Sequence, residues 1–135
     1  MSAVLVDSNV LLDILTVNNP WYAWSSNALA TAADSARLVI NTIIYAEVSV
    51  RFSRIEDLEE AFPRSFVIRE PIPDAAAFLA GKVYLAYRRR GGTRTAPLPD
   101  FLIGAHAAVA GHRLLTRDPA RYRTNFPQLA LITPP

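Results

Sequence analysis

Short, unbroken runs of apolar residues recur along the chain, with longer segments of helical periodicity between them. The first run, residues 3–6, is apolar without alternation, which is typical of a strand covered on both faces in a parallel sheet. Similar runs predict further strands at 37–41, 66–68, 113–116 and 129–132. Because strands and helices alternate, we expect an α/β fold with a central parallel sheet of four to five strands and right-handed crossovers.

The segments between these runs predict the helices that flank the sheet. Ser8 or Asn9 can cap the first helix, and Thr42 can cap the helix that follows the second strand. Gly111 is placed to end the last long helix, which is rich in small residues. The expected helices span 10–15, 21–33, 42–52, 54–62, 75–90 and 99–110, with a short helical turn at 121–126.

Length and composition indicate one compact domain covering residues 1–135. The chain is 51% hydrophobic and 19% charged, and it contains no linker, repeat or low-complexity tract. It has no cysteine, which excludes thiol catalysis, disulfides and cysteine-based metal sites. Asp7 interrupts any signal peptide, and no apolar run reaches the ~20 residues of a membrane helix, so we expect a soluble cytoplasmic protein without membrane contact.

The basic residues are almost all arginine, with Lys82 as the single lysine, and many of the arginines lie in the second half of the chain. Arginine's planar fork binds phosphate in a bidentate way, so this bias is consistent with a nucleic-acid ligand. A GC-rich genome would produce the same preference on an ordinary solvated surface. Composition alone leaves both explanations open.

Four acidic residues are expected to meet at the carboxyl edge of the sheet. Asp7 and Asp118 follow strands directly, while Glu47 and Asp100 lie in helices that begin near the same edge. Two carboxylates ~4 Å apart repel by roughly 4 kcal/mol at an effective dielectric near 20, so such a cluster needs cations. Oxygen ligands without cysteine predict Mg²⁺ or Mn²⁺.

Each of these residues also has a simpler interpretation. Asp7 can serve only as a helix cap, and Glu47 can form an ion pair with Arg51, four residues along the helix. His106 and His112 can act as general acids, but a packed or surface role is favoured for both.

Four motifs follow one another along the chain: Val6-Asp7-Ser8-Asn9, Glu47, Leu98-Pro99-Asp100 and Leu114-Leu115-Thr116-Arg117-Asp118. Their order and spacing resemble those of PIN-domain ribonucleases of the VapC toxin type. The resemblance covers nearly the whole chain and implies a three-layer PIN-like domain. It implies that Asp7, Glu47, Asp100 and Asp118 hold one or two metal ions, and that Asn9 and Thr116 orient carboxylates or water. It also implies a homodimer that cuts single-stranded or loop RNA and is inhibited by a VapB-like antitoxin.

The expected chemistry is hydrolysis of a phosphodiester bond by metal-activated water, with no side-chain nucleophile. Arg94, in a loop, and Arg117 are candidate RNA ligands, although a surface role explains Arg117 equally well. An antitoxin arginine is expected to meet the carboxylates in place of metal. Because mutual repulsion should dominate in the metal-free cluster, we expect Asp7→Asn and Asp100→Asn each to leave metal-free stability equal or higher.

Three other functions fit parts of the pattern. A PIN-like domain that has lost catalysis would serve only as a protein-binding module. A phosphoaspartate-type phosphohydrolase would need a second aspartate two residues after the first, where this chain has Asn9. A phospho-receiver would need a lysine after a late strand, and Lys82 lies in a predicted helix.

Overall fold

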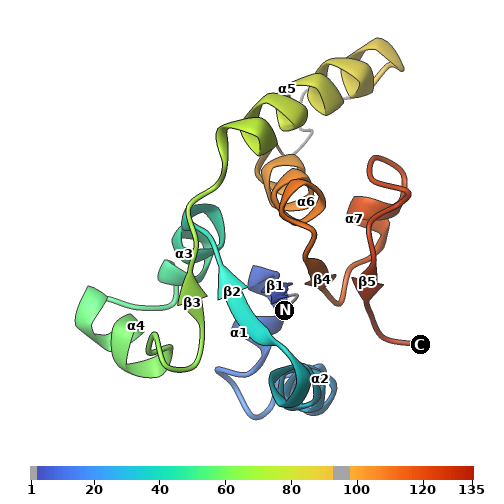
Figure 1. Ribbon diagram of the computed structural model, residues 1–135. Coiled ribbons are helices and arrows are strands. Elements are labelled where there is room, and N and C mark those ends of the chain that lie inside the picture. The colour runs from blue at the N-terminus through green and yellow to red at the C-terminus, as the bar shows by residue number, and fades with distance from the viewer. Residues whose placement is uncertain (1–2, 93–97) are drawn as a thin grey trace.

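A five-stranded sheet, parallel throughout, forms the centre of the computed structural model, which describes residues 3–92 and 98–135. The strand order is β3-β2-β1-β4-β5, which confirms the predicted α/β class (Figure 1). Every residue of β1 is buried, as its unbroken apolar run predicts. The strands are β1 (Ala3–Val6), β2 (Arg37–Ile40), β3 (Ile68–Arg69), β4 (Arg113–Leu115) and β5 (Leu131–Ile132).

Helices cover the sheet in two groups. The chain runs outward from β1 to β3 and then returns past β1 to β4 and β5, so right-handed crossovers place the two groups on opposite faces. In Figure 1, α5 lies against α6 and extends away from the sheet. The first group is α1 (Ser8–Asp13), α2 (Tyr22–Ser35), α3 (Thr42–Ser49) and α4 (Ile55–Ala61); the second is α5 (Asp74–Arg89), α6 (Leu98–Ala110) and α7 (Ala120–Arg123).

Small residues allow close packing around α6, which carries part of the candidate site. A Cβ atom on Gly104 would lie 2.4 Å from the Phe126 ring, so only glycine permits this approach. Gly111 has a φ of +72° and ends the helix as predicted. Within the described ranges, no helix is long and apolar enough to cross a membrane.

Two strands begin two residues later than predicted, and the strands predicted at 37–41 and 113–116 each end one residue early. The strand expected at 66–68 is observed at Ile68–Arg69, because the N–H groups of Phe66 and Val67 both donate to the Pro63 carbonyl in a turn. The last strand begins at Leu131 rather than at residue 129, because the Leu129 N–H donates back to the Phe126 carbonyl. Apolar residues in these turns still pack against the core, so their hydrophobicity resembled that of a strand.

The helix caps also differ from those predicted. The Asp7 carboxylate caps α1 by accepting from the Ser8 N–H, in place of Ser8 or Asn9. The Asn41 side chain caps α3 by accepting from the Ile44 N–H, in place of Thr42. In both cases the cap is the residue that directly follows a strand, so a polar side chain is fixed at the carboxyl edge of the sheet.

Candidate active site

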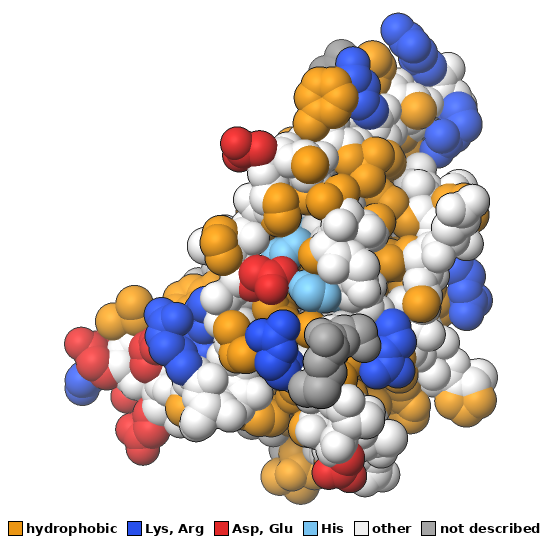
Figure 2. Space-filling model, in the orientation of Figure 1, with side chains coloured by type: hydrophobic (Ala, Val, Ile, Leu, Met, Phe, Trp, Pro, Cys, Tyr) orange, Lys and Arg blue, Asp and Glu red, His pale blue; other side chains and the backbone are white. Residues whose placement is uncertain are grey.

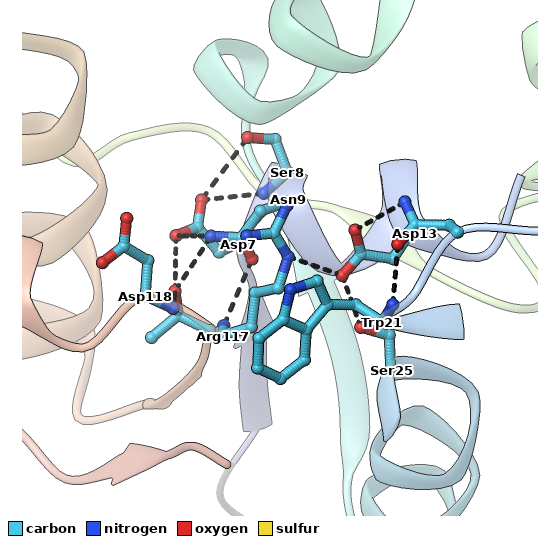
Figure 3. Close-up of polar contacts among 10 residues, drawn as sticks. Asp7, Ser8, Asn9, Asp13, Trp21, Ser25, Arg117 and Asp118 are labelled. Atoms are coloured by element: carbon cyan, nitrogen blue, oxygen red, sulfur yellow. Dashed lines mark hydrogen bonds and ion pairs between the residues drawn. The ribbon is translucent and has the colours of Figure 1, made fainter. Parts of the chain in front are cut away.

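Asp7 lies at the end of the central strand, and its carboxylate is completely buried. One oxygen accepts from the Ser8 N–H at 2.8 Å. The other accepts from the Thr116 hydroxyl at 2.9 Å, the Tyr122 hydroxyl at 2.8 Å and the Asn9 amide at 3.4 Å. Figure 3 shows Asp7 beside Ser8 and Asn9. Asp7 is therefore both a helix cap and a rigidly oriented carboxylate at the sheet edge, so the two interpretations of this residue are compatible.

Asn9 and Thr116 connect Asp7 to the turn after β4. The Asn9 amide donates to Thr116 Oγ1 at 3.2 Å, and its carbonyl oxygen accepts from the Arg117 N–H at 3.3 Å. Thr116 Oγ1 also accepts from the Asp118 N–H at 3.1 Å. These bonds tie the turn to the start of α1, so both residues lie where they can orient neighbouring carboxylates.

Glu47 is half-buried and faces the start of α1. Its carboxylate accepts from the Ser8 hydroxyl at 2.8 Å, which links α3 to the residue beside Asp7. Arg51 donates instead to Thr16 Oγ1 at 2.8 Å. Among the described contacts, the alternative ion pair between Glu47 and Arg51 is therefore absent.

Asp100 and Asp118 share one counter-ion, Arg121 on α7. The Nε atom of Arg121 lies 2.8 Å from Asp118 Oδ2, and its Nη1 atom lies 3.6 Å from Asp100 Oδ1. Burial raises the pKa of Asp100 to about 6, and the charges of Asp7, Glu47 and Asp118 add to this rise while Arg121 opposes it. Asp100 therefore lies close enough to the other three predicted acids to be affected by their charges.

The acids are nevertheless not drawn into a tight cluster. Within the described ranges, no three of their carboxylates have oxygen atoms all within 4.8 Å of one another. Ser8 connects Asp7 to Glu47, and Arg121 connects Asp100 to Asp118. Hydrogen bonds and one cation thus hold the carboxylates at the same edge without direct contact.

Arg117 extends away from these acids. Its Nε atom donates to the buried carboxylate of Asp13 at 2.8 Å, and its guanidinium lies 5.6 Å from the centre of the Trp21 ring (Figure 3). Asp13 also accepts from the Ser25 hydroxyl at 2.7 Å. The ion pair holds the turn after β4 against α1, which is a structural use of Arg117. Arg94 lies outside the described residues.

Two site residues were not selected from the sequence: Arg121 and Tyr122. Burial raises the pKa of the Tyr122 hydroxyl, and the Asp7 charge raises it further, so this group stays protonated and donates to Asp7. The one available signal for Arg121 was its position three residues after Asp118 in a predicted helical turn. Nothing in the sequence showed that Tyr122 points toward β1.

A second polar cluster joins Glu70, which follows β3, to the two histidines. The Nε2 atoms of His106 and His112 both lie 2.7 Å from Glu70 Oε1, and Figure 2 shows histidine and acidic atoms together on the face in view. All three donor atoms lie within 4.8 Å of one another, a spacing that could suit a metal ion. The hydrogen bonds of Asn41 decide between a metal site and a polar network.

Asn41 fixes the protonation of His106. Its carbonyl oxygen accepts from the Ile44 N–H at 2.9 Å, so its NH₂ group faces His106 Nδ1 at 3.0 Å. Nδ1 is then an acceptor, Nε2 carries the proton, and His106 donates to Glu70 without a lone pair for a cation. Burial alone would raise the pKa of Glu70, but the hydrogen bonds from His112 and His106 outweigh it and lower that pKa. His106 is therefore a packed group, within the packed or surface role favoured from the sequence, and the partly buried His112 contacts the same carboxylate.

Comparison with known families and structures gives a consistent result. The family model described as the PIN domain matches residues 4–127. No curated protein matches the chain. VapBC2 from Rickettsia felis, solved with a promoter DNA fragment, is 17% identical with a TM-score of 0.74, covering 98% of this chain and 99% of the other.

Two further solved structures cover both chains to a similar extent. VapBC-1 from nontypeable Haemophilus influenzae is 17% identical over 97% of each chain, with a TM-score of 0.73. A toxin–antitoxin complex from Klebsiella pneumoniae is 23% identical over 99% of this chain and 98% of the other, with a TM-score of 0.69. At these identities, the similarity establishes a shared fold.

Proposed function

This chain belongs to the PIN-domain family, and from that membership and its acidic site we propose that it is a metal-dependent endoribonuclease toxin of the VapC type. The main supporting observation is Asp100, a buried carboxylate whose pKa is raised to about 6 by burial and by three further acids. Such a concentration of negative charge at one edge of a sheet, with a perturbed carboxyl group in it, is typical of a functional site. The fold is also shared with structures described as VapBC and toxin–antitoxin complexes.

The donor set suits Mg²⁺ or Mn²⁺. Asp7, Glu47, Asp100 and Asp118 offer only oxygen atoms, which hard divalent cations prefer. When bound, such an ion supplies Lewis acidity that activates water and stabilises the negative charge on the phosphate. Asp100 and Asp118 are the most direct ligands, because a single cationic side chain already joins them.

The remaining residues hold this site in shape. Thr116, Asn9 and Tyr122 saturate one oxygen of Asp7, so its carboxylate cannot rotate freely. Ser8 keeps Glu47 facing the same edge. Since hydrogen bonds within the protein fix these side chains, the site is preorganised before any ligand arrives.

The proposal extends to partners. We expect a VapB-like antitoxin that presents an arginine to the carboxylates, where Arg121 shows that a guanidinium already fits. A homodimer in the cytoplasm and RNA contacts from Arg94 also follow from the VapC type. Arg117, whose side chain is 32% exposed while its Nε atom pairs with Asp13, is the second candidate RNA contact.

Cleavage of RNA in the presence and absence of EDTA tests the function. Purified protein should cut single-stranded or loop RNA with Mn²⁺ and should lose this activity with EDTA. Asp100→Asn should be inactive, while Asp74→Asn, an exposed aspartate in the first turn of α5, should cut normally. Equal cleavage with EDTA, or by a folded Asp100→Asn protein, would exclude the proposed site.

A further inference from the structure

Arg121 stands between the acidic site and an open cavity of about 390 Å³. Asp100 also borders this cavity, and Arg90 lies on its wall with its guanidinium bonded to Asn125 Oδ1 at 2.8 Å. Two arginines and the acidic residue Asp100 therefore line this cavity. The lining also includes Tyr87, Phe101 and Asn125.

The contacts of Arg121 are those of a replaceable cation. Among the described contacts, its Nε atom lies 2.8 Å from Asp118 Oδ2, whereas its Nη1 atom lies 3.6 Å from Asp100 Oδ1. Its side chain is 44% exposed, whereas that of Asp100 is 7% exposed. Exposed ion pairs contribute little net free energy, so a stronger cation can displace this guanidinium at small cost.

We propose that Arg121 is an internal cation that neutralises Asp100 and Asp118 in the empty protein and, once a divalent ion binds them, turns into the adjoining cavity to hold an RNA phosphate. Repulsion between two cations drives the exchange, and the cavity gives the released guanidinium a destination beside Arg90. The metal exchange rests on these ion pairs and on the proposed metal site. The phosphate contact rests on the proposed ribonuclease function.

Metal affinity without RNA tests the exchange. Calorimetric titration with Mn²⁺ should show that Arg121→Gln binds about three- to tenfold more tightly than wild type, because the competing cation is gone. The matched control is Arg123→Gln, an exposed arginine on the same helix, which changes the net charge equally and should bind as wild type does. Unchanged or weaker Mn²⁺ binding by folded Arg121→Gln would overturn the proposal.

RNA affinity tests the proposed contact between the released Arg121 guanidinium and an RNA phosphate. With Ca²⁺, which takes the same oxygen ligands, Arg121→Gln should bind a fluorescent RNA about tenfold more weakly than wild type, the scale of one charged hydrogen bond. In EDTA the loss should not exceed that of Arg123→Gln, since Arg121 then pairs with the carboxylates. Equal losses in both conditions would refute the movement toward phosphate.

A measurement on wild-type protein removes any dependence on variant folding. The NMR signal of the Arg121 Nε–H should shift and exchange faster with water on adding Mg²⁺, as its bond to Asp118 breaks, while the Arg123 signal stays unchanged. An unmoved Arg121 signal at saturating Mg²⁺ would disprove the exchange. A wild-type protein that shows the shift but cleaves no RNA would refute the ribonuclease function and the phosphate contact, and would leave the metal exchange supported.

Discussion

Replacing Asp100 by asparagine should stabilise the metal-free protein. The pKa of Asp100 rises from its ordinary 3.8 to about 6 in the folded chain, mainly through burial. Each pKa unit corresponds to 1.36 kcal/mol, so the ionised carboxylate costs about 3 kcal/mol near neutral pH. Because asparagine keeps the shape without the charge, we expect Asp100→Asn to raise the free energy of unfolding by about 1 to 3 kcal/mol.

The stability advantage of Asp100→Asn should depend on pH in a direction that follows from this pKa shift. The folded state holds the Asp100 proton more tightly than the unfolded state, so the contribution of this group is greatest below pH 3.8 and is lost as pH rises to about 6. The advantage of Asp100→Asn should therefore be full above pH 6 and should disappear near pH 4. Urea unfolding in EDTA at pH 4, 5 and 7.5 measures it.

A matched control separates site repulsion from a general effect on helix starts. Asp74 is also in the first turn of a helix, but it is exposed. Asp74→Asn should lose a favourable interaction with the helix dipole and become about 0.3 to 1 kcal/mol less stable. If Asp100→Asn is destabilised at pH 7.5 as much as Asp74→Asn, the reasoning about repulsion at Asp100 is wrong.

Three other changes have defined outcomes in urea unfolding with EDTA. Asp7→Asn should cost about 1 to 3 kcal/mol, because its new NH₂ group would face buried donors; equal or higher stability would contradict this. Arg117→Ala should cost about 3 kcal/mol by leaving Asp13 buried and unpaired, and a change below ~1 kcal/mol would contradict it. Glu70→Gln should cost about 1 to 2 kcal/mol near pH 7, since the carboxylate accepts from His106 and a second imidazole. The pKa of Glu70 is lowered, so this difference should shrink as pH falls below 4.5, and a difference that grows on acidification would exclude the network.

The order of elements was predictable because apolar runs and helical periodicity report burial directly. All five strands and their parallel direction follow from this pattern. The exact ends did not, because Phe66 and Val67 are as apolar as strand residues but donate to Pro63 in a turn. Hydrophobicity reports that a residue is buried and does not report which carbonyl its N–H reaches.

The acidic edge was predictable for a similar reason: an aspartate after a strand must lie at the carboxyl end of the sheet. Its contacts were not, because they depend on side chains far apart in sequence. Tyr122 reaches Asp7 from α7, and Arg121 joins two acids that lie on different elements. The tyrosine carries no local sign of its partner, and the only local sign for Arg121 is its spacing of three residues from Asp118.

Asp7 and Asp100 show why a shared position does not imply a shared response to mutation. Both are buried acids at one edge, and the sequence-based expectation was that asparagine at either position would leave metal-free stability equal or higher. The structure gives Asp7 a set of hydrogen-bond donors, whereas the Asp100 carboxylate, among the described contacts, faces one guanidinium at 3.6 Å. Hydrogen-bond donors stabilise a carboxylate and disfavour the amide that replaces it. Repulsion from neighbouring negative charges destabilises a carboxylate and favours the neutral amide. The expectation for Asp7 is therefore corrected, and the opposite signs predicted for the two variants distinguish a satisfied carboxylate from one that is ready to bind a cation.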